Sequence, residues 1–346
     1  MQKRWLINSR NTKPVWQRLN SARHPQNRSD SRKEQNMHQT DLYPSDHFWL
    51  EKVGQGLYAA IHREGGAAIG NAGIVDLGDS TLVFDTFISP AAAKDLRQAA
   101  EILTGRPVSY VFNSHYHNDH IRGNQEFPEA QIISTDQTRL LLQTDGMQEL
   151  AWDQANAPPK YQQYLNEYEQ SSSQAQRDQV LFWLDYYRVL ADSLDGLRIC
   201  EPQRTFKDQL ILSGSKRSVH LLCFGGGHTG SDGFLYVPDE GVAFLADLLF
   251  VQCHPFLADG HPENWISILK KLKSLDADVL VPGHGPVGSQ PDLDLMIEYI
   301  QMTAEAAQRA SNDETNPLPP PFDTWKFDGF FSINLGFMSR WQSQNH

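Results

Sequence analysis

Cysteine is scarce in this sequence. Three cysteines, Cys200, Cys223 and Cys253, occur in 346 residues, and no two of them are close together. An odd number at this spacing excludes a disulfide framework and a CxxC metal site. Because free thiols persist in a reducing compartment, we expect a cytoplasmic location.

Long apolar runs and an excess of positive charge are also missing. No stretch approaches the roughly 18 to 20 apolar residues that a membrane-spanning helix requires. The formal net charge of −12 at pH 7 disfavours binding to nucleic acid and to anionic membrane surfaces, because both are negatively charged. We therefore expect a soluble protein whose partner is a small-molecule substrate, with no nucleic acid and no membrane; a homo-oligomer is compatible with this composition.

Two signatures of other enzyme classes are absent as well. The chain has no GxSxG elbow to expose a nucleophilic serine, so Ser231 and Asp232, which follow His228, are interpreted as loop or capping residues. It has no Walker motif either, and we predict no residues that bind a nucleotide cofactor.

The first 40 residues have a different composition from the rest of the chain. Residues 1–36 contain nine Lys or Arg against two acids, Asp30 and Glu34, and few aliphatic side chains. This composition predicts a disordered basic tail over residues 1–40. It is also typical of transit peptides, which is the alternative interpretation.

Residues 41–310 have the pattern of one α/β domain, with short apolar runs bounded by Gly, Asp and Asn. Strands are predicted over residues 56–62, 72–78, 80–86, 108–114, 131–135, 208–213, 219–224, 233–237, 241–247 and 278–283. Ser89-Pro90 offers an N-cap followed by proline at the first helical position, so a helix should begin there, and a second amphipathic helix is predicted over residues 262–275.

Residues 137–196 form a predicted helical insertion between two β-rich halves. Tyrosines and other apolar residues recur there at spacings of three and four, as Tyr161, Tyr164 and Tyr168 illustrate. We favour a pair of helices that packs aromatic side chains against the core over a lid that lines the substrate site. The C-terminal extension, residues 311–346, should pack back on the domain or form a subunit contact.

The densest chemistry lies in the segment Ser114-His115-Tyr116-His117-Asn118-Asp119-His120. Imidazole and carboxylate are the usual non-thiolate ligands of zinc and similar ions. In an extended segment His115 and His117 point the same way, whereas Asp119 and His120 lie beyond a turn and aim at a neighbouring point. The spacing therefore predicts two metal ions.

Further ligands are expected at the ends of apolar strands in the second half. His228 follows LLCFGGG, Asp247 follows VAFLA, and His284 follows VLVPG. Strand ends that open into loops are where α/β folds place their chemistry. One such residue alone would be unremarkable, but three of them together with the histidine-rich segment favour a metal site.

At these motifs the chain resembles the metallo-β-lactamase superfamily. His115-x-His117-x-Asp119-His120 matches its HxHxDH motif, and GGGHTGSD, FLADLLF and VPGHGP resemble its later ligand segments in the same order. The resemblance covers residues 50–300. It implies an αββα four-layer sandwich of two similar halves, with the metals at one edge.

The resemblance also implies a role for each residue. The first ion would be held by His115, His117 and His228, the second by Asp119, His120 and His284, and Asp247 would bridge both. Asp85 matches an aspartate that accepts the distal N–H of a ligand histidine. Asp119 and Asp247 are the predicted catalytic residues, because they tune the ions.

The implied activity is that of a metallo-hydrolase, in which a hydroxide held between two zinc ions cleaves an ester, thioester, lactone or β-lactam-type bond in a small molecule. β-Lactamases with a cysteine ligand carry it at the position of Asp247, so this chain is closer to the glyoxalase II and lactonase branch. The alternatives are an iron-containing redox enzyme similar to dioxygenases, a phosphodiesterase, and a noncatalytic metal-binding scaffold; iron or manganese could replace zinc.

Two other histidines lie on a loop after Asp247. His254 and His261, in CHPFLADGHP, could touch a substrate, but we interpret both as surface-loop residues.

Overall fold

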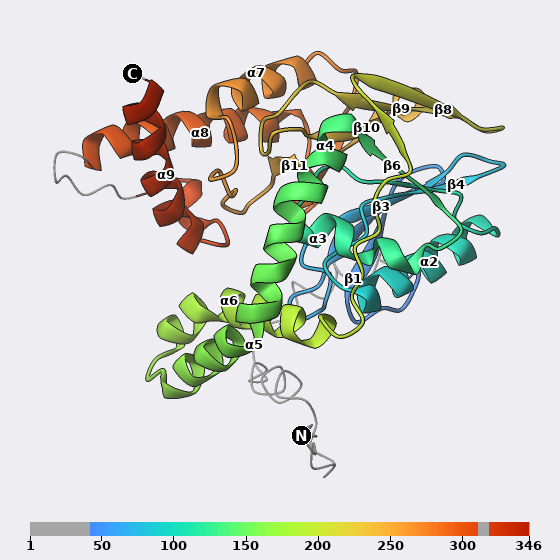
Figure 1. Cartoon of the computed structure of the whole chain (residues 1–346). Helices are drawn as coiled ribbons and strands as arrows, with labels where there is room; N and C mark the ends of the chain where they lie inside the picture. The colour runs from blue at the N-terminus through green and yellow to red at the C-terminus, as the bar shows by residue number, and fades with distance from the viewer. Residues whose placement is uncertain (1–41, 311–317, 346) are drawn as a thin grey trace, which may run out of the picture. The chain divides into compact units, whose positions relative to one another are not determined.

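Two β-sheets face each other in the computed structural model, which describes residues 42–310 and 318–345 (Figure 1). The predicted basic tail, residues 1–40, lies outside the described residues. Residues from Tyr43 onward belong to one compact unit. Among the described helices, none combines the length and the apolar character that crossing a bilayer requires.

The first sheet has seven strands in their chain order. They are β1 (Phe48–Gly54), β2 (Leu57–His62), β3 (Ala72–Asp76), β4 (Thr81–Phe84), β5 (Tyr110–Phe112), β6 (Gln131–Thr135) and β7 (Arg204–Phe206). Strands β1 to β4 pair antiparallel, and β4 to β7 pair parallel. The carboxyl ends of β4, β5 and β6 therefore meet at one edge of the sheet.

The second sheet has the order β12-β11-β10-β9-β8. Its strands are β8 (Gln209–Ser213), β9 (Ser218–Cys223), β10 (Gly233–Val237), β11 (Val242–Phe250) and β12 (Val279–His284). Only β11 and β12 pair parallel among these five, so their carboxyl ends also share an edge.

Apolar side chains from both sheets form the core between them. Phe84 and Phe112 of the first sheet and Phe244 of the second belong to this cluster, with ring centroids 5.6 and 5.7 Å apart for the two pairs that involve Phe84. A Cβ added at Gly73 would overlap the Phe244 ring, so this glycine of β3 permits the close approach of the sheets.

Helices cover the outer face of each sheet, which completes the αββα arrangement. Helix α2 (Pro90–Thr104) begins as predicted: the Ser89 side chain accepts a hydrogen bond from the Ala92 amide, and Pro90 occupies the first turn. It packs on the first sheet. Helices α7 (Pro262–Leu272) and α8 (Gln290–Ala310) cover the second sheet, where Trp265 and Tyr299 are fully buried.

The helical insertion lies between β6 and β7 of the first sheet rather than between the two halves, and it consists of α4 (Asp136–Leu141), a π-helical turn (Leu142–Gly146), α5 (Met147–Gln170) and α6 (Gln174–Ser193). One face of α6 packs in a small cluster, where Tyr187 is buried and stacks on Tyr164 at 5.5 Å. Phe182, Trp183 and Tyr186 remain partly exposed. Trp183 and Tyr186 also pack against this cluster, as the predicted aromatic packing implies, whereas Phe182 does not belong to it.

The described part of the C-terminal extension, residues 318–345, packs back on the second half. It contains a 3-10 turn (Phe322–Thr324) and α9 (Gly329–Asn345), and Phe322, Phe331 and Met338 join the core formed by α7 and α8. Asn334, in the middle of α9, is completely buried.

Candidate metal centre

The histidine-rich segment connects β5 to α3 (Asn118–Ile121) at the shared edge of the first sheet. His117 is in extended conformation and precedes the first residue of α3. Because the chain turns into a helix there, Asp119 and His120 project to a different point from His115, as the spacing predicts. His115 and His120 are 1% and 0% exposed.

The second sheet supplies the other three predicted ligands. His228 lies in the loop after β9, and His284 is the last residue of β12. Asp247 lies inside β11 rather than at the end of a strand, which corrects the sequence-based placement. Ala246 has a positive φ of 47° and the pairing with β12 is irregular on both sides of it, and such a kink re-aims the next side chain.

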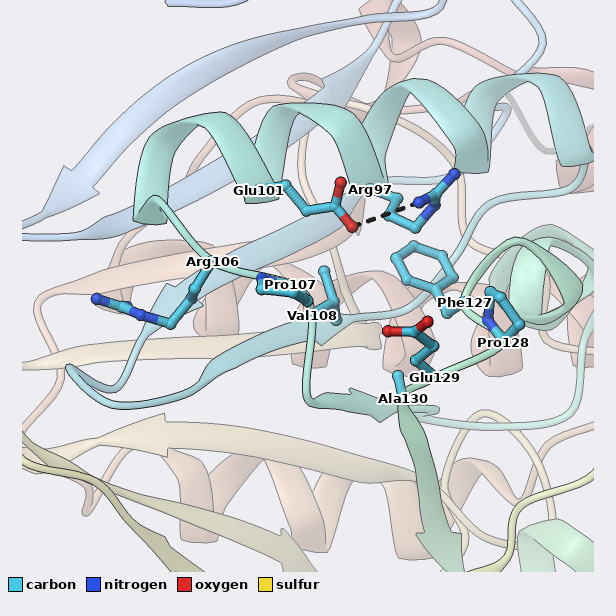
Figure 2. A pocket seen from close by; sticks show the side chains of 9 residues that line it. All are labelled: Arg97, Glu101, Arg106, Pro107, Val108, Phe127, Pro128, Glu129 and Ala130. Carbon is cyan, nitrogen blue, oxygen red and sulfur yellow. Dashed lines mark hydrogen bonds and ion pairs between the residues drawn. The ribbon is translucent and has the colours of Figure 1, made fainter.

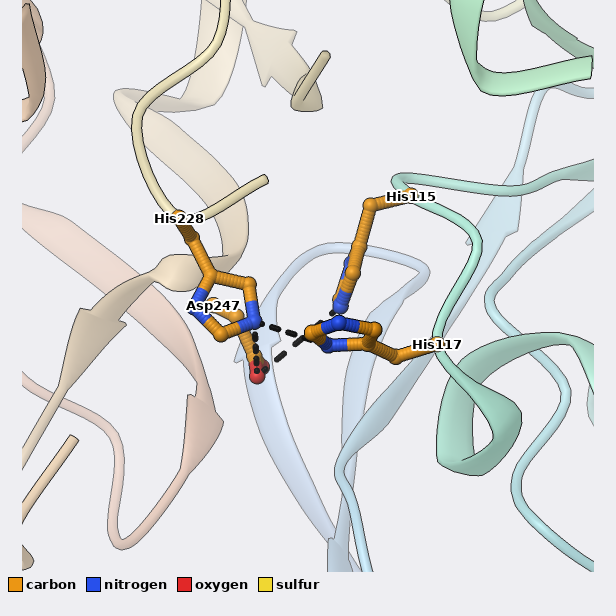
Figure 3. Close-up of side chains that lie close together, drawn as sticks. All are labelled: His115, His117, His228 and Asp247. Atoms are coloured by element: carbon orange, nitrogen blue, oxygen red, sulfur yellow. Dashed lines mark hydrogen bonds and ion pairs between the residues drawn. The ribbon is translucent and has the colours of Figure 1, made fainter. Parts of the chain in front are cut away.

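The seven side chains gather in two clusters. The first cluster contains His115, His117, His228 and Asp247, which Figure 3 shows converging on one point. The second cluster contains Asp119, His120 and His284. Within each cluster every residue offers one nitrogen or oxygen atom, and these atoms lie within 4.8 Å of one another.

Distances in the first cluster centre on the Asp247 carboxylate. Its Oδ2 lies 3.2 Å from His228 Nε2 and 3.9 Å from His115 Nε2. His117 presents Nδ1, which lies 3.0 Å from His228 Nε2. Three imidazole nitrogens and one carboxylate oxygen therefore face the same small volume.

In the second cluster, Asp119 Oδ2 lies 3.2 Å from His284 Nε2 and 3.5 Å from His120 Nε2. Asp247 reaches this cluster too: its Oδ1 lies 3.1 Å from His120 Nε2, and its Oδ2 lies 3.5 Å from His284 Nε2. One carboxylate thus contacts both clusters.

These residues fit a metal ion in each cluster. His115 Nε2, His120 Nε2 and Asp247 Oδ1 are buried and have no hydrogen-bond partner, although buried polar atoms are normally satisfied. Nitrogen and carboxylate donors suit zinc, iron and manganese, and no cysteine belongs to either cluster.

The protonation of the two clusters reflects the opposing charges inside them. Burial opposes a charge on His284, but Asp247 and Asp119 raise its pKa to about 9. Burial likewise opposes a charge on Asp247, but the adjacent histidines His120, His284 and His228 hold its pKa well below the usual range. The carboxylates therefore stay ionised and favour positive charge at this point.

The second cluster is supported by Asp85, which follows β4 with a φ of 56° and is completely buried. Its Oδ2 lies 2.9 Å from His120 Nδ1. The Ser114 amide and hydroxyl each donate a hydrogen bond of 2.8 Å to the same carboxylate. Asp85 thus holds the distal nitrogen of His120 and leaves Nε2 facing the cluster.

The first cluster is supported by the loop of residues 254–259, on which the sequence analysis considered His254 but missed Phe256 and Asp259. Asp259 Oδ2 lies 3.0 Å from His117 Nε2, and the Phe256 carbonyl lies 3.1 Å from His228 Nδ1. Each partner occupies the distal nitrogen, so the opposite nitrogen faces the cluster. Nothing in the sequence marks either residue, because both contacts span many residues without a local motif.

Asn334 of α9 holds this loop in place. Its Nδ2 donates to the Pro255 carbonyl at 2.7 Å, and its Oδ1 accepts from the Leu257 amide at 2.9 Å. The C-terminal extension therefore reaches the first cluster through two successive hydrogen-bonded contacts.

The predicted surface position of His254 is wrong. Its side chain is completely buried, with Nδ1 2.9 Å from the Tyr299 hydroxyl and its ring next to Trp325, because α8 and the C-terminal extension cover the loop. His261 is exposed and caps α7 by accepting from the Asn264 amide. Asp232 accepts from the Gly227 and Thr229 amides, as a loop residue should.

Gly283 lies beside the carboxylate that both clusters share. A Cβ at this position would overlap Asp247 Oδ1 and the backbone at Ala246. Only glycine therefore lets β12 pass the kink of β11 at this distance.

A separate pocket of about 340 Å³ lies at the opposite ends of β5 and β6 (Figure 2). It is lined by Arg97 and Glu101 of α2 and by the segments 106–108 and 127–130. Arg97 pairs with Glu101 and Arg106 with Asp76, so the cationic groups already have partners. None of the seven clustered residues lines this pocket.

The profile of the metallo-β-lactamase superfamily matches residues 65–142 and 182–284, which together are more than half of the chain. Both segments contain clustered residues, and the unmatched stretch between them is most of the helical insertion.

Two curated proteins are similar in sequence. A linear primary-alkylsulfatase from Pseudomonas sp. (strain ATCC 19151) is 22% identical over 253 residues, covering 67% of this chain but only 44% of the relative. The chain thus spans less than half the length of that relative. The alpha subunit of a 2,4-dinitroanisole O-demethylase from Nocardioides sp. (strain JS1661) is 26% identical over 278 residues, covering 75% of this chain and 70% of the relative.

Solved structures share the fold at low sequence identity. A metallo-β-lactamase from Pontibacter korlensis superposes with a TM-score of 0.54 at 16% identity, covering 73% of this chain and 99% of that one. The metallo-β-lactamase FIM-1 from Pseudomonas aeruginosa, in its mono-zinc form, superposes with a TM-score of 0.52 at 12% identity. This superposition covers 74% of this chain and 95% of that one. With the αββα sandwich, the two clusters and the superfamily profile in agreement, this chain belongs to the metallo-β-lactamase superfamily.

Proposed function

We propose that this chain is a hydrolase that uses two zinc ions to cleave an ester, thioester, lactone or β-lactam-type bond in a small molecule. The observation that carries the proposal is the position of Asp247, whose two carboxylate oxygens lie within 3.5 Å of histidine nitrogens from both clusters. A carboxylate with an oxygen near each cluster could serve two adjacent ions at once.

The ligands follow from the two clusters. His115, His117 and His228 would hold the first ion, Asp119, His120 and His284 the second, and Asp247 both. When bound, such a pair activates a water molecule near neutral pH and stabilises the negative charge that develops on the substrate.

The protein's own contribution is the orientation of the ligands. Asp85 occupies Nδ1 of His120, Asp259 occupies Nε2 of His117, and the Phe256 carbonyl faces Nδ1 of His228. Each contact fixes which imidazole nitrogen is free to face the cluster. Asp119 and Asp247 contribute negative charge in a buried setting, where it is weakly screened.

A sulfate ester or an aryl ether is the second candidate for the bond that is cleaved. It is favoured by the sequence similarity to an alkylsulfatase and to a subunit of an O-demethylase. Iron in the clusters would instead favour redox chemistry, because the same nitrogen and oxygen donors accept it.

Elemental analysis of the full chain, followed by a substrate panel, tests the proposal. We expect about two zinc ions per chain and hydrolysis of at least one ester, thioester, lactone, β-lactam or sulfate ester. His117→Ala should lose metal and abolish hydrolysis, whereas His261→Ala, an exposed helix cap, should change neither.

Three results would contradict it. Iron as the resident metal would point to the redox alternative, and two zinc ions without turnover of any panel member would point to a noncatalytic scaffold. Unchanged metal content and activity in His117→Ala would show that the clusters are not the active site.

A further inference from the structure

Six partly exposed aromatic side chains lie beside the two ligand clusters, and we call them the aromatic rim. They come from three separate segments of the chain: α6, the 254–259 loop and the start of the C-terminal extension. The members are Phe182, Trp183, Tyr186, Phe256, Phe327 and Phe330.

The rings of the rim contact one another across these segments. Phe182 lies 4.6 Å from Phe327 and 5.5 Å from Phe330, measured between ring centroids. Phe256 lies 5.7 Å from Phe330. Aromatic pairs at these separations attract each other, so the rim is one continuous surface.

The rim borders both clusters. The Phe256 ring centroid is 6.3 Å from that of His117 in the first cluster, and the Phe327 centroid is 6.3 Å from that of His284 in the second. The Tyr186 hydroxyl accepts a 2.8 Å hydrogen bond from Asn118, the neighbour of Asp119. A molecule whose reactive group lies at the ions would therefore have the rest of its surface against the rim.

Packing against the core accounts for only part of the rim. Trp183 and Tyr186 contact the cluster around Tyr187, and Phe327 contacts the core of the second half, whereas Phe182, Phe256 and Phe330 lie outside these two clusters. The buried face of α6 is already formed by Leu184, Tyr187 and Leu190, and the extension is anchored by Phe322 and Phe331, which are 0% and 8% exposed. Contiguous apolar surface that remains partly exposed beside a candidate site is typical of a ligand-binding surface.

The charged groups around the rim favour an uncharged ligand group there. Asp259 contacts His117, and Glu149 of α5 lies 4.0 Å from Arg122. Arg122 is buried against Asp153, and Lys326 pairs with Glu64. All six rim side chains are uncharged aromatic rings, so the rim itself offers an anionic group no ion pair.

We propose that the aromatic rim binds a flat, uncharged aromatic group, so that the preferred substrates carry an aryl group next to the bond that is cleaved. The choice of bond rests on the proposed function, but the binding of the ring does not. Stacking on aromatic faces discriminates a flat ring from a saturated ring of the same size.

Direct binding tests the proposal without turnover. The full-length, metal-loaded protein is titrated by NMR with 2-acetylnaphthalene and with its fully saturated decalin analogue, two neutral ketones that cannot be hydrolysed. We expect the flat ketone to bind about tenfold more tightly. Phe182→Ala and Phe330→Ala should each weaken its binding about three- to tenfold.

Two further variants keep the result interpretable. Phe182→Leu retains apolar volume without the ring, so it should lose the preference for the flat ketone while keeping the fold. Trp152→Ala removes an exposed aromatic ring of α5 that contacts Lys160, and it should leave the affinities for both ketones unchanged.

Equal affinity for the two ketones, or unchanged binding in the Phe182 and Phe330 variants, would overturn the proposal. Its failure is separable from that of the proposed function. The rim variants should retain full metal content, whereas a misassigned metal centre would lack metal and leave ketone binding intact.

Discussion

The two ligand clusters share Asp247 but are supported by different parts of the molecule. In the second cluster, His120 is held by Asp85, a buried residue at the end of a strand whose carboxylate also accepts two hydrogen bonds from Ser114. In the first cluster, His117 and His228 are held by the 254–259 loop. One cluster is supported by the sheet, the other by a loop.

The loop in turn depends on the C-terminal extension. Asn334 of α9 bonds the backbone of residues 255 and 257, and the Tyr299 hydroxyl of α8 links His254 to Asn334. The comparison teaches that two adjacent sites of similar ligands can differ in what disturbs them. Changes in the extension should affect the first cluster and spare the second.

Loss of the carboxylate that contacts both clusters should weaken metal binding at both of them, unlike the changes described below, which should affect one cluster each. We expect Asp247→Ala to weaken metal binding more than about 100-fold at both, because it deletes a ligand and leaves several histidines close together without a compensating charge. Titration with cobalt, followed by the ligand-field absorbance, measures each site. Retention of one equivalent at unchanged affinity would show that Asp247 serves a single cluster.

Asp85→Asn should affect the second cluster alone. Loss of such a partner typically costs about 10- to 100-fold in metal affinity. An asparagine amide would also face donors, since Asp85 accepts three hydrogen bonds in this position. Cobalt titration should show one weakened and one unchanged site. Equal weakening of both would contradict the claim that Asp85 supports the second cluster alone.

Asn334→Leu should affect the first cluster alone, with an expected loss of about tenfold in metal affinity. The substitution leaves the Leu257 amide and the Pro255 carbonyl without their partner, at about 1 to 3 kcal/mol each in the free energy of unfolding. Gln342→Leu is the matched control, because Gln342 lies on the same helix and bonds Ala304 instead of the loop. A purely structural role for Asn334 would lower stability and leave both metal affinities unchanged.

Asp259→Asn should have the smallest effect, about threefold, again at the first cluster. Its side chain is 45% exposed, so solvent screens the contact with His117. The affinity of the first site should fall and that of the second should stay the same. If Asp259→Asn lost as much metal affinity as Asp85→Asn, then the exposure of these aspartates would not determine how strongly each one supports its histidine.

The sequence predicted the seven clustered residues and the order of their segments, because HxHxDH and the strand-end residues are local patterns. It did not predict Asp259 or Asn334. Their contacts join positions 142 and 77 residues apart, and an isolated Asp or Asn has no spacing that distinguishes it from a turn residue. The same reason explains His254, which is buried only because distant helices cover it.

The secondary structure was predictable where the pattern was strong. Most strands and α2 lie where apolar runs and the Ser89-Pro90 cap placed them. Strands β1 and β7 and helix α8 were not predicted. The short β7 has few apolar residues, and β1 mixes apolar and charged side chains, so pairing with neighbouring strands decides their conformation.

Neither half of the chain contains a complete cluster. His115, His117, Asp119 and His120 follow β5 of the first sheet, whereas His228, Asp247 and His284 belong to the second. An ion in either cluster would therefore act as a cross-link between the two sheets, which the chain itself joins at the short connection from β7 to β8. Chelation should then lower the melting temperature of the whole domain rather than loosen one loop, because ions that bind only the folded state stabilise all of it.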